Sequence, residues 1–589
     1  MDNQKFGKLK KISGSRNLLW VVCIFCLLIV FYVVSSGVFP TKNPLVGHDA
    51  SYHYLRMEAL ADRLRSGEIV SGGIDYLFYD GLGYASSLAY PDVFLYIPAV
   101  LRLMGVGIGT SMAVFLIFCN ACCMFSMFYC IYRMSENPVA ATIATVIFTT
   151  SFYRIDNLYT RFALGEVQAF IFWPIIIYGL YDLIFRDFKK PYIIGFGFVG
   201  MLLTHTLSTA LAVVVCVVIV LIFAKRLLKE PKKIIRLVIT ALCVLVVTSF
   251  YWIPLLELMN SCELTVSHPI SKASDNSVKF FGIFRDTSIG YDVAGLGILI
   301  FALCITRVFI QVKALSNEDT GKKNKVCEKN LVLFADACLF TGLLFAFLST
   351  KSAPWGILAH VFDFIQFAWR MFAVVTVMLS VAVAVYLYII LKNIKSSEVA
   401  TIIFTLMMVI NINVHIETIG ICHAEVYNDD YYTSDVNRTY NIGYGEWLPW
   451  SAKNITDKVK ENAHRVVLND GTEAKYQKED TYLAFIVDDK TYEYADVPYI
   501  WYKGYVAYDE CGNEYRTSMS DMGFVRVEFD GVKPEGNIYV EYQLTTLQIV
   551  SYTVSIVSVV ALIGFGIFTK MRSSKKSKED NSEQVKEGA

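Results

Sequence analysis

Long hydrophobic runs, almost free of charge, recur along this chain and are separated by shorter polar segments. The clearest are Leu18 to Phe39, Val293 to Val312, Met371 to Leu391 and Leu547 to Thr569. Each holds about 20 residues, and at roughly 1.5 Å per residue a helix of that length crosses the hydrocarbon core of a bilayer. Because lipid offers no hydrogen-bond partner to backbone amides, these runs predict membrane-spanning helices.

The whole pattern predicts a polytopic α-helical membrane protein with about twelve spans. They begin near Leu18, Ser111, Pro138, Leu164, Pro191, Leu207, Ile234, Val293, Leu331, Met371, Val399 and Leu547. The stretch from Pro191 to Ala224 is predicted to cross twice as a short hairpin, with its turn at residues 204–206 on the outer side. The apolar segment from Leu88 to Met104 is interrupted by two prolines and an arginine, so it is predicted to be interfacial or re-entrant.

Basic residues cluster in the loops of one side. Examples are Arg186, Lys189 and Lys190; Lys225, Arg226, Lys229, Lys232 and Lys233; and Lys322, Lys323 and Lys325. Short basic loops stay in the cytoplasm, so both termini are predicted to be cytoplasmic and the number of crossings even. We therefore expect a multi-pass protein of the plasma membrane, with the lipid bilayer as its partner.

These predictions divide the chain into a series of parts. They are a cytoplasmic basic N-terminus (1–17), a transmembrane domain (18–414) with a large first outer loop (40–110), an extracytoplasmic β-rich domain (415–546), a last transmembrane helix (547–569) and a cytoplasmic charged tail (570–589). In the β-rich domain apolar and polar residues alternate, for example in Phe524-Val-Arg-Val-Glu-Phe, and turn sequences such as Asp530-Gly531 follow. Such alternation is typical of half-buried strands and predicts a small β sandwich.

The composition also indicates lipid as the main environment. Of 589 residues, 55% are hydrophobic and 18% are charged, and the mean hydropathy is +0.46. Soluble domains are nearer 45–50% apolar and about 25% charged. Most of the 14 cysteines lie in the apolar runs, and no cysteine pair stands near a second ligand pair, which argues against a zinc site. The sequence leaves open whether Cys422 and Cys511 are bridged, and we expect no nucleic-acid partner.

A first polar motif, Gly47-His48-Asp49 with His53 and Arg56, follows the first span. Asp49 is predicted to be the N-cap of a helix that has one apolar face. On that helix Asp49, His53 and Arg56 share a side, so a carboxylate, an imidazole and a guanidinium are expected to project together at the membrane surface. The alternative is an amphipathic interfacial helix with a solvated polar face.

A second polar motif joins two apolar spans on the side opposite the basic loops. It contains Arg154, Asp156, Tyr159, Arg161 and Glu166. Charges this close to hydrocarbon are costly and usually pair or bind something, and arginines suit phosphate because their hydrogen bonds are forked. The alternative is an internal ion-pair network that joins Arg154 to Asp156 and Arg161 to Glu166.

Weaker signals lie further along the chain. They are His205 at the predicted hairpin turn, Trp252 and Glu257 at the end of the seventh span, and Gln366 and Arg370 in the segment that leads into the tenth span. A histidine at a loop tip is more often solvated, and a tryptophan at the interface is most often an anchor. These residues alone would not indicate a site.

In their order along almost the whole chain, the motifs resemble the GT-C class of membrane glycosyltransferases. More narrowly, they resemble a bacterial membrane protein family labelled 6-pyruvoyl-tetrahydropterin-synthase-related and the YfhO-like group. Besides the two polar motifs, the resemblance is carried by Leu203-Thr204-His205, Tyr251-Trp252-Ile253-Pro254, Gln366-Phe367-Ala368-Trp369-Arg370, Gly445-Glu446-Trp447-Leu448-Pro449 and Val497-Pro498-Tyr499. Ala368 stands where the family pattern has proline, which affects the local bend rather than the chemistry.

The resemblance implies transfer of a sugar from a polyprenyl-phosphate-linked donor to an extracytoplasmic acceptor, which is a cell-envelope glycan, a glycolipid or a protein. Such a transfer needs a base for the acceptor proton and cations for the departing phosphate. Asp49 is expected to be the base or to orient the acceptor. Asp156 or Glu166 is expected to position the sugar, or a divalent metal ion if one is used.

The same resemblance implies the residues that bind the substrate. Arg154, Arg161 and Arg370 are expected to hold phosphate, and His48, His53, Arg56, Tyr159, His205 and Gln366 are expected to contact the substrate or the residues around it. The sugar, the acceptor and the linkage stay undefined by the sequence.

Two other functions fit the composition. A transporter or flippase of lipid-linked glycans would place polar groups near the bilayer midplane and often shows internal repeats, whereas here the charges lie at the outer margin and no repeat is found. A non-catalytic envelope assembly protein would use the outer domain to bind a partner, and it would leave the charged motifs to ion pairing alone.

Overall fold

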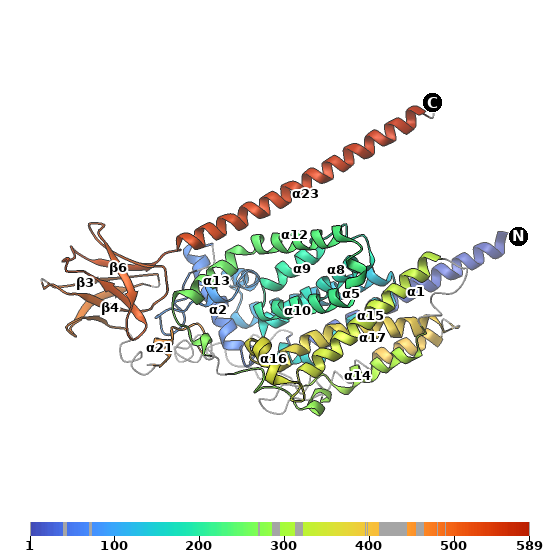
Figure 1. Ribbon diagram of the computed structural model, residues 1–589, viewed down its shortest axis with the longest axis horizontal. Coiled ribbons are helices and arrows are strands. Elements are labelled where there is room, and N and C mark those ends of the chain that lie inside the picture. Colours follow the sequence, from blue (N-terminus) through green and yellow to red (C-terminus); the bar gives the residue numbers. More distant parts are fainter. Residues whose placement is uncertain are drawn as a thin grey trace.

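The structure is a computed structural model that describes residues 2–38, 44–69, 73–268, 271–285, 295–311, 322–394, 396, 399–410, 445–454, 464–479, 481–488 and 490–587. The molecule is elongated, with a β barrel at one end and a bundle of helices beside it (Figure 1). Both chain ends lie at the end opposite the barrel. This arrangement agrees with an even number of crossings, and the side of the membrane on which the ends lie stays a prediction.

Six helices of the described chain are long and apolar enough to cross a membrane. They are α1 (Asp2–Ser35), α5 (Ile108–Ser135), α8 (Leu164–Phe185), α15 (Lys322–Leu348), α17 (Phe372–Lys392) and α23 (Thr546–Glu587). The total reaches eight if two bent pairs each count as one span. These pairs are α6 (Pro138–Thr149) with α7 (Phe152–Tyr159), bent by 49°, and α12 (Pro231–Val247) with α13 (Ser249–Ser261), bent by 68°.

Shorter apolar helices account for the difference from the predicted count. They are α9 (Tyr192–Leu202), α10 (Thr206–Ile222), α14 (Ile298–Cys304), α16 (Trp355–Phe362) and the helix Val399–Ile410. Helices of this length fall below the roughly 20 residues that a straight span needs. The predicted number of about twelve spans is therefore not confirmed, although α9 and α10 form the hairpin expected around residues 204–206.

The centre of the bundle is formed by α17 and α8. The apolar window of α17 is 94% buried and that of α8 is 83% buried. Helix α17 packs against α15 and α6, and α8 packs against α5 and α9. Helices enclosed in this way are hydrophobic on all faces, in contrast to α23, whose apolar window is only 11% buried.

The first outer loop contains α2 (Ala50–Ser66), α3 (Ser86–Ala89) and α4 (Tyr96–Leu103). Helix α2 ends at Gly67, whose φ of +88° is the left-handed conformation that commonly closes a helix. The segment predicted to be interfacial or re-entrant covers the end of α3 and the whole of α4. Two short helices, α11 (Ala224–Leu227) and α21 (Trp450–Asn454), lie in later connections.

The β-rich domain is a closed antiparallel barrel, so the predicted sandwich is wrong. Its strands are β1 (Val466–Leu468), β2 (Glu473–Lys478), β3 (Tyr482–Ile486), β4 (Tyr494–Ile500), β5 (Tyr505–Asp509), β6 (Glu514–Met519), β7 (Phe524–Glu528) and β8 (Ile538–Tyr542), in the order β1-β2-β3-β8-β5-β6-β7-β4. Val540 of β8 pairs with Leu483 on one side and Ala507 on the other, while β4 joins β7 to β1. Alternation predicts strands, but closure depends on these pairings between strands distant in sequence, which leave no free edge.

The barrel is fixed to the helices by polar contacts as well as by a shared hydrophobic core. The Ile500 amide donates to the Leu82 carbonyl at 2.8 Å, and the Trp447 amide donates to the Tyr84 hydroxyl at 3.1 Å. Glu257 at the end of α13 accepts from Thr545 at 2.6 Å and pairs with Lys503 at 2.9 Å. Glu257 therefore connects α13 to the barrel and to the start of α23.

The predicted start of the outer domain and one of its cysteines lie outside the described residues. These are His415 and Cys422. The Cys511 thiol is exposed and donates to the Glu535 carboxylate at 3.2 Å. A bridge between Cys422 and Cys511 stays untested.

Candidate active site

The two polar motifs, which are distant in sequence, meet through their backbones. The His48 amide donates to the Thr160 carbonyl at 3.2 Å, and the Asp49 amide donates to the Arg161 carbonyl at 2.9 Å. Gly47 allows this approach, because a Cβ atom there would lie 2.4 Å from the Phe162 Cβ. The carboxylate that follows the first span is therefore placed beside the connection between α7 and α8.

That connection has a strained turn at Phe162. Its φ is +53°, a conformation that is uncommon for a bulky residue and costs of order 1–3 kcal/mol. The Thr160 and Arg161 amides both donate to the Asp156 carbonyl, at 3.0 Å and 2.9 Å, and so close the end of α7. The turn sets Arg161 close enough to Glu166, in the first turn of α8, for an ion pair at 3.1 Å. This half of the predicted ion-pair network is present.

Glu166 is a buried carboxylate that several donors hold in place. It accepts from the Tyr153 hydroxyl at 2.6 Å, from Arg161 at 3.1 Å and from the Asn157 amide group at 3.4 Å. The Arg370 Nε lies 3.6 Å away. A buried carboxylate needs such partners because burial of an unpaired charge is costly. The geometry suits Glu166 to orienting two guanidinium groups.

Arg370 approaches from the short turns that precede α17. Its Nη1 donates to the Ile365 carbonyl at 2.7 Å and to the Gln366 side-chain oxygen at 2.8 Å. Gln366 itself has a φ of +63°, so it is a second strained non-glycine position. It lies near the charged side chains of Asp49, Arg161, Glu166 and Arg370, which we call the polar cluster. Gln366 therefore orients Arg370 rather than standing alone, and the two weak sequence signals form one unit.

Asp49 differs from Glu166 because its side chain is accessible. It occupies the N-cap position of α2 without a capping hydrogen bond, and among the described residues its carboxylate has no hydrogen-bond or ion-pair partner. Burial by the surrounding protein raises the pKa of the Asp49 carboxyl, and the charges of Arg161 and Arg370 oppose this rise. The Asp49 side chain is therefore exposed although it lies close to two guanidinium groups.

Neutral histidines and a tyrosine lie close to the charged residues of the site. The Tyr90 ring lies 6.0 Å from His53 and 6.2 Å from His205, centroid to centroid, and its hydroxyl contacts Gly165, where a Cβ would be 2.1 Å away. The Nδ1 of His205 accepts from the Ser208 amide at 3.3 Å and so caps α10. Burial lowers the pKa of His205 to about 4, and burial also lowers that of His53. Both imidazoles are therefore neutral near pH 7.

Arg56 turns away from Asp49, contrary to the expected joint projection. It forms a buried ion pair with Asp92 at 2.5 Å and donates to the Pro91 carbonyl at 3.0 Å. Its guanidinium carbon lies 4.5 Å from the centre of the Tyr90 ring. Arg56 holds the segment before α4 against α2, and it lies 3.4 Å from the His53 Nδ1, a long contact.

Four predicted residues take other places. Arg154 is buried and donates to the Thr149 carbonyl at 3.0 Å and to Asn120, so the predicted pair with Asp156 is wrong. The Tyr159 hydroxyl donates to the Val34 carbonyl at 2.5 Å and fixes α7 to α1. Asp156 is buried near Arg161. His48 is exposed next to Asp49.

Several residues of the cluster were not singled out as site residues from the sequence. They are Tyr52, Tyr90, Asp92, Asn120, Tyr153, Asn157 and Glu446. Asp92 had a usable signal, because a carboxylate within an apolar segment is expensive and requires a partner. Glu446 lies near enough for the Asp49 charge to act on it, in a motif recognised only through the resemblance. No local pattern marks Tyr90, which joins the cluster only in the folded chain.

The described residues contain no group of three histidine, cysteine, aspartate or glutamate side chains arranged to hold a metal ion. The metal dependence of the chain stays open.

An apolar groove lies beside the Arg56–Asp92 ion pair. It has a volume of about 570 Å³ and is bounded by the segment before α4, by α13 and by α23. Leu88, Pro91 and Asp92 line its inner side, next to the Arg56 pair, and Tyr552, Ile556 and Val560 of α23 line its outer side. Isoleucine and valine side chains of α23 are exposed here, so the groove faces the surface expected to contact lipid.

Comparison with known proteins adds limited information. No family model matches the chain. An uncharacterized protein of Lactococcus lactis subsp. cremoris (strain MG1363) is 25% identical over 255 residues, which are 41% of this chain and 41% of that protein. The matched region thus covers less than half of the length of this curated relative.

Two kinds of solved structure are similar to the chain. The arabinofuranosyltransferase AftD from Mycobacteria has 15% identity and a TM-score of 0.39, over 68% of this chain and 26% of AftD. ArnT from Cupriavidus metallidurans bound to undecaprenyl phosphate has 13% identity and a TM-score of 0.34, over 76% of this chain and 82% of ArnT. Likeness at this level defines neither a reaction nor a substrate here, and the YfhO-like family is not confirmed.

Proposed function

We propose that this chain is a membrane glycosyltransferase that moves a sugar from a polyprenyl-phosphate donor to an acceptor hydroxyl on the outer face of the membrane. The observation that carries the proposal is the accessible Asp49 carboxylate, unpaired among the described residues, held next to a cluster of two guanidinium groups. An unpaired carboxylate can accept a proton, whereas the Glu166 carboxylate already accepts hydrogen bonds from its neighbours.

Asp49 suits the part of general base. Burial raises its pKa, which makes the carboxylate a better proton acceptor than an exposed aspartate. In the reaction, the acceptor oxygen bonds to the anomeric carbon while its proton passes to an Asp49 oxygen. The bond from the anomeric carbon to the phosphate oxygen breaks, and its electron pair leaves on polyprenyl phosphate.

Arg161 and Arg370 suit the binding of that phosphate. Each uses one terminal nitrogen in the described hydrogen bonds, so further N–H groups remain for an anion. Glu166 holds both guanidiniums in fixed positions, which is the preorganisation that stabilises a charge developing on a leaving group. In this proposal Glu166 and Gln366 are positioning residues, and Asp156 supports Arg161 from the end of α7.

The apolar groove supports a lipid-linked donor. It begins beside Asp92 and opens between α13 and α23 toward the surface expected to contact lipid. A polyprenyl chain in this groove would place its phosphate at the polar cluster without leaving the apolar environment. Exchange with the bilayer would need no passage through water.

Unsatisfied donors next to His53 and Arg370 in the sequence support a polar ligand. Among the described residues, the Tyr52 hydroxyl and the Trp369 Nε1 are buried without a hydrogen-bond partner. Buried polar groups are nearly always satisfied, so such atoms call for an explanation. Hydroxyl groups of a sugar would supply the missing partners, and in this proposal the barrel binds the acceptor.

The proposal is tested by donor consumption. The full chain is reconstituted in liposomes with a panel of radiolabelled polyprenyl-phosphate sugars. Extracts of the components on the outer face of the membrane supply the acceptor. We expect release of polyprenyl phosphate from at least one donor and loss of that release with Asp49→Asn. Intact donors throughout the panel, or equal release by Asp49→Asn, would refute the proposed function.

A further inference from the structure

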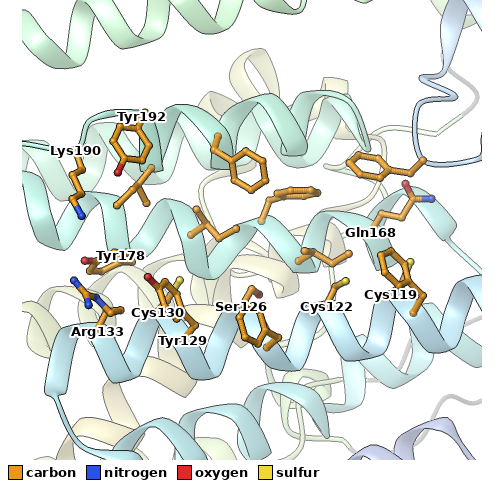
Figure 2. A pocket seen from close by; sticks show the side chains of 18 of the residues that line it. Cys119, Cys122, Ser126, Tyr129, Cys130, Arg133, Gln168, Tyr178, Lys190 and Tyr192 are labelled. Carbon is orange, nitrogen blue, oxygen red and sulfur yellow. The ribbon is translucent and has the colours of Figure 1, made fainter. Parts of the chain in front are cut away.

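A second and larger apolar groove lies away from the polar cluster, between α5, α8 and α9. Its volume is about 670 Å³. Figure 2 shows rows of aromatic and aliphatic side chains facing each other along it. Phe118 and Phe125 of α5 and Phe196 of α9 are among its lining residues and are strongly exposed. An apolar slot that is open along its length on a membrane helix surface is the shape of a lipid chain.

The two ends of this groove differ in charge. At one end Gln168 is the polar lining residue, while Arg133 and Lys190 line the opposite end with Tyr178 and Tyr192 (Figure 2). Both cations are exposed. Lys190 belongs to the basic loop that the positive-inside rule assigns to the cytoplasm. The charged end is thus expected at the cytoplasmic interface, and the neutral end deeper in the bilayer.

Arg186 adds to this positive end. It donates to the Arg133 carbonyl at 2.6 Å and to the Tyr178 hydroxyl at 3.3 Å, so it fixes the end of α8 against the end of α5. The acidic groups nearby are Asp182, on which the Arg186 and Lys190 charges act, Asp187, which pairs with Lys189 at 2.8 Å, and Glu136, whose charge acts on Arg133. None of these three acidic residues lines the groove, so the charged residues of its lining, Arg133 and Lys190, are both cations.

The floor of the groove is set by close packing of α9 on α8. At Gly200 a Cβ atom would lie 2.0 Å from the Phe172 ring, so only glycine permits this distance. Helix α9 is also only 11 residues long, which leaves the slot open beside α5. The fold thus builds the groove from rigid helices rather than from a loop.

We propose that this groove binds one anionic phospholipid, with an acyl chain along α5 and α9 and its phosphate between Arg133 and Lys190. The apolar walls give little selectivity, because bulk lipid is as apolar as they are. Selection comes from the two cations, since basic pockets between membrane helices at the cytoplasmic side hold anionic headgroups. The tyrosines at this end match the aromatic belt at a membrane interface.

This site is separate from the donor groove described above. It is lined by α5, α8 and α9, whereas the donor groove is lined by α13 and α23 and touches α9 only through Val199. Its charged end faces the predicted cytoplasmic side, and the Asp49 cluster is on the outer side. A lipid held here would stabilise the packing of α5 on α8 and α9, and the inference does not depend on the proposed function.

The test compares lipids with identical acyl chains on the full-length protein. Native mass spectrometry of the detergent-purified chain is recorded with added phosphatidylglycerol or phosphatidylcholine. We expect one phosphatidylglycerol to be retained about tenfold more than phosphatidylcholine, and the variant Arg133→Gln/Lys190→Gln to lose that preference. The control Lys229→Gln/Lys232→Gln removes two exposed cations of the same predicted side that do not line the groove, and should keep it. Equal retention of both lipids by the wild type, or an unchanged preference in the first variant, would overturn the proposal.

A second test does not depend on the folding of the Arg133→Gln/Lys190→Gln variant. A phosphatidylglycerol with a photoreactive group on its acyl chain is crosslinked to the wild-type protein, and the modified peptides are identified. We expect them to come from α5, α8 and α9, and Cys122→Phe to reduce them about fivefold, while Ala121→Phe on an exposed position of the same helix leaves them unchanged. Crosslinks spread over all lipid-facing helices would contradict a specific site. Loss of the crosslinks only when free glycerol phosphate is added as a competitor would indicate that the headgroup binds without the acyl chain, which would contradict a groove that holds the chain.

Discussion

The two acidic positions of the cluster, Asp49 and Glu166, differ in every property that decides a chemical role. Glu166 is 3% exposed and accepts from Tyr153, Arg161 and Asn157. Asp49 is accessible, and among the described residues it has no partner for its carboxylate. The sequence alone offers both as catalytic carboxylates. Their surroundings make one a structural anchor and leave the other able to take a proton.

The chemical role of each carboxylate thus depends less on its position in the chain than on the groups that surround it. Asp49 is fixed through its backbone by the hydrogen bond to the Arg161 carbonyl, so its side chain stays free. Glu166 is fixed through its side chain. A buried charge with several donors contributes to stability and loses its freedom to react. Changing each residue should therefore have opposite effects on folding and turnover.

The largest effect is expected from Asp49→Asn. Loss of a general base typically costs 10²- to 10⁴-fold in rate, and we expect release of polyprenyl phosphate to fall by about that factor. The thermal midpoint should not change, because the side chain has no described partner. Donor consumption and fluorescence-detected unfolding measure the two quantities. The matched control is Asp62→Asn on the same helix, which should leave turnover unchanged; an equal loss there would remove Asp49 from its proposed role.

Glu166→Gln should show the reverse pattern. The change leaves Arg161 and Arg370 without their shared counter-charge, and breaking a buried pair in this way costs about 3–5 kcal/mol. We expect a lower thermal midpoint in detergent and a turnover loss that follows the folded fraction and the misplaced guanidiniums. A stable, inactive Glu166→Gln variant would instead indicate direct chemistry by this carboxylate.

The two arginines of the second motif sharpen the comparison. Arg161→Lys keeps the charge but loses the forked donor, so we expect turnover to fall by roughly 10- to 100-fold. Arg154→Lys loses the bonds to Asn120 and Thr149 inside the bundle, so it should lower stability while the folded protein keeps its turnover. Specific activity per folded molecule separates the two variants, and a catalytic defect confined to Arg154→Lys would reverse the assignment.

The pH dependence tests the state of Asp49. Because burial raises its pKa, the rate should fall as the pH is lowered through a value above the ordinary aspartate pKa, which is about 3.9. Below that point the base is protonated and the rate drops about tenfold per pH unit. His205, whose pKa is about 4, is neutral at higher pH, so it causes no fall in rate on the alkaline side of the profile. An acid limb at or below 3.9 would show that Asp49 is not the group that titrates.

The smallest effect is expected from Tyr159→Phe. Its hydroxyl donates to the Val34 carbonyl, and removal of such a buried bond costs about 1 kcal/mol. We expect a small drop in thermal midpoint and little change in turnover. A large rise in the donor concentration needed for half-maximal rate would place Tyr159 in contact with substrate after all.

Much of the helical fold could be predicted from hydrophobic runs, because lipid permits only helices and closed barrels. The hairpin of α9 and α10 and the approximate starts of α5, α8 and α17 could be predicted from these runs. The number of full spans could not be predicted, because bends such as the 68° angle between α12 and α13 depend on packing. Barrel closure likewise depends on β4 pairing with β1 and β7.

The site was predicted in part. The charges of Arg161 and Glu166 stood out because they lie next to hydrocarbon, and the chain brings them to Asp49. The partner of Arg56 could not be inferred, since Asp92 lies on a separate segment whose position depends on the fold. The distinction between an open and a sealed carboxylate was also beyond the sequence, because it depends on donors from three different elements.

A catalytic Asp49 has to be accessible from the outer side of the membrane, and labelling of a cysteine at this position measures that accessibility. An Asp49→Cys variant, with Cys262, Cys422 and Cys511 replaced by serine, is exposed in intact cells to a membrane-impermeant maleimide. We expect rapid labelling at position 49 in intact cells, slowed by a bound polyprenyl-phosphate donor. Labelling only after the membrane is opened would place this carboxylate on the cytoplasmic side and exclude it from a reaction at the outer face.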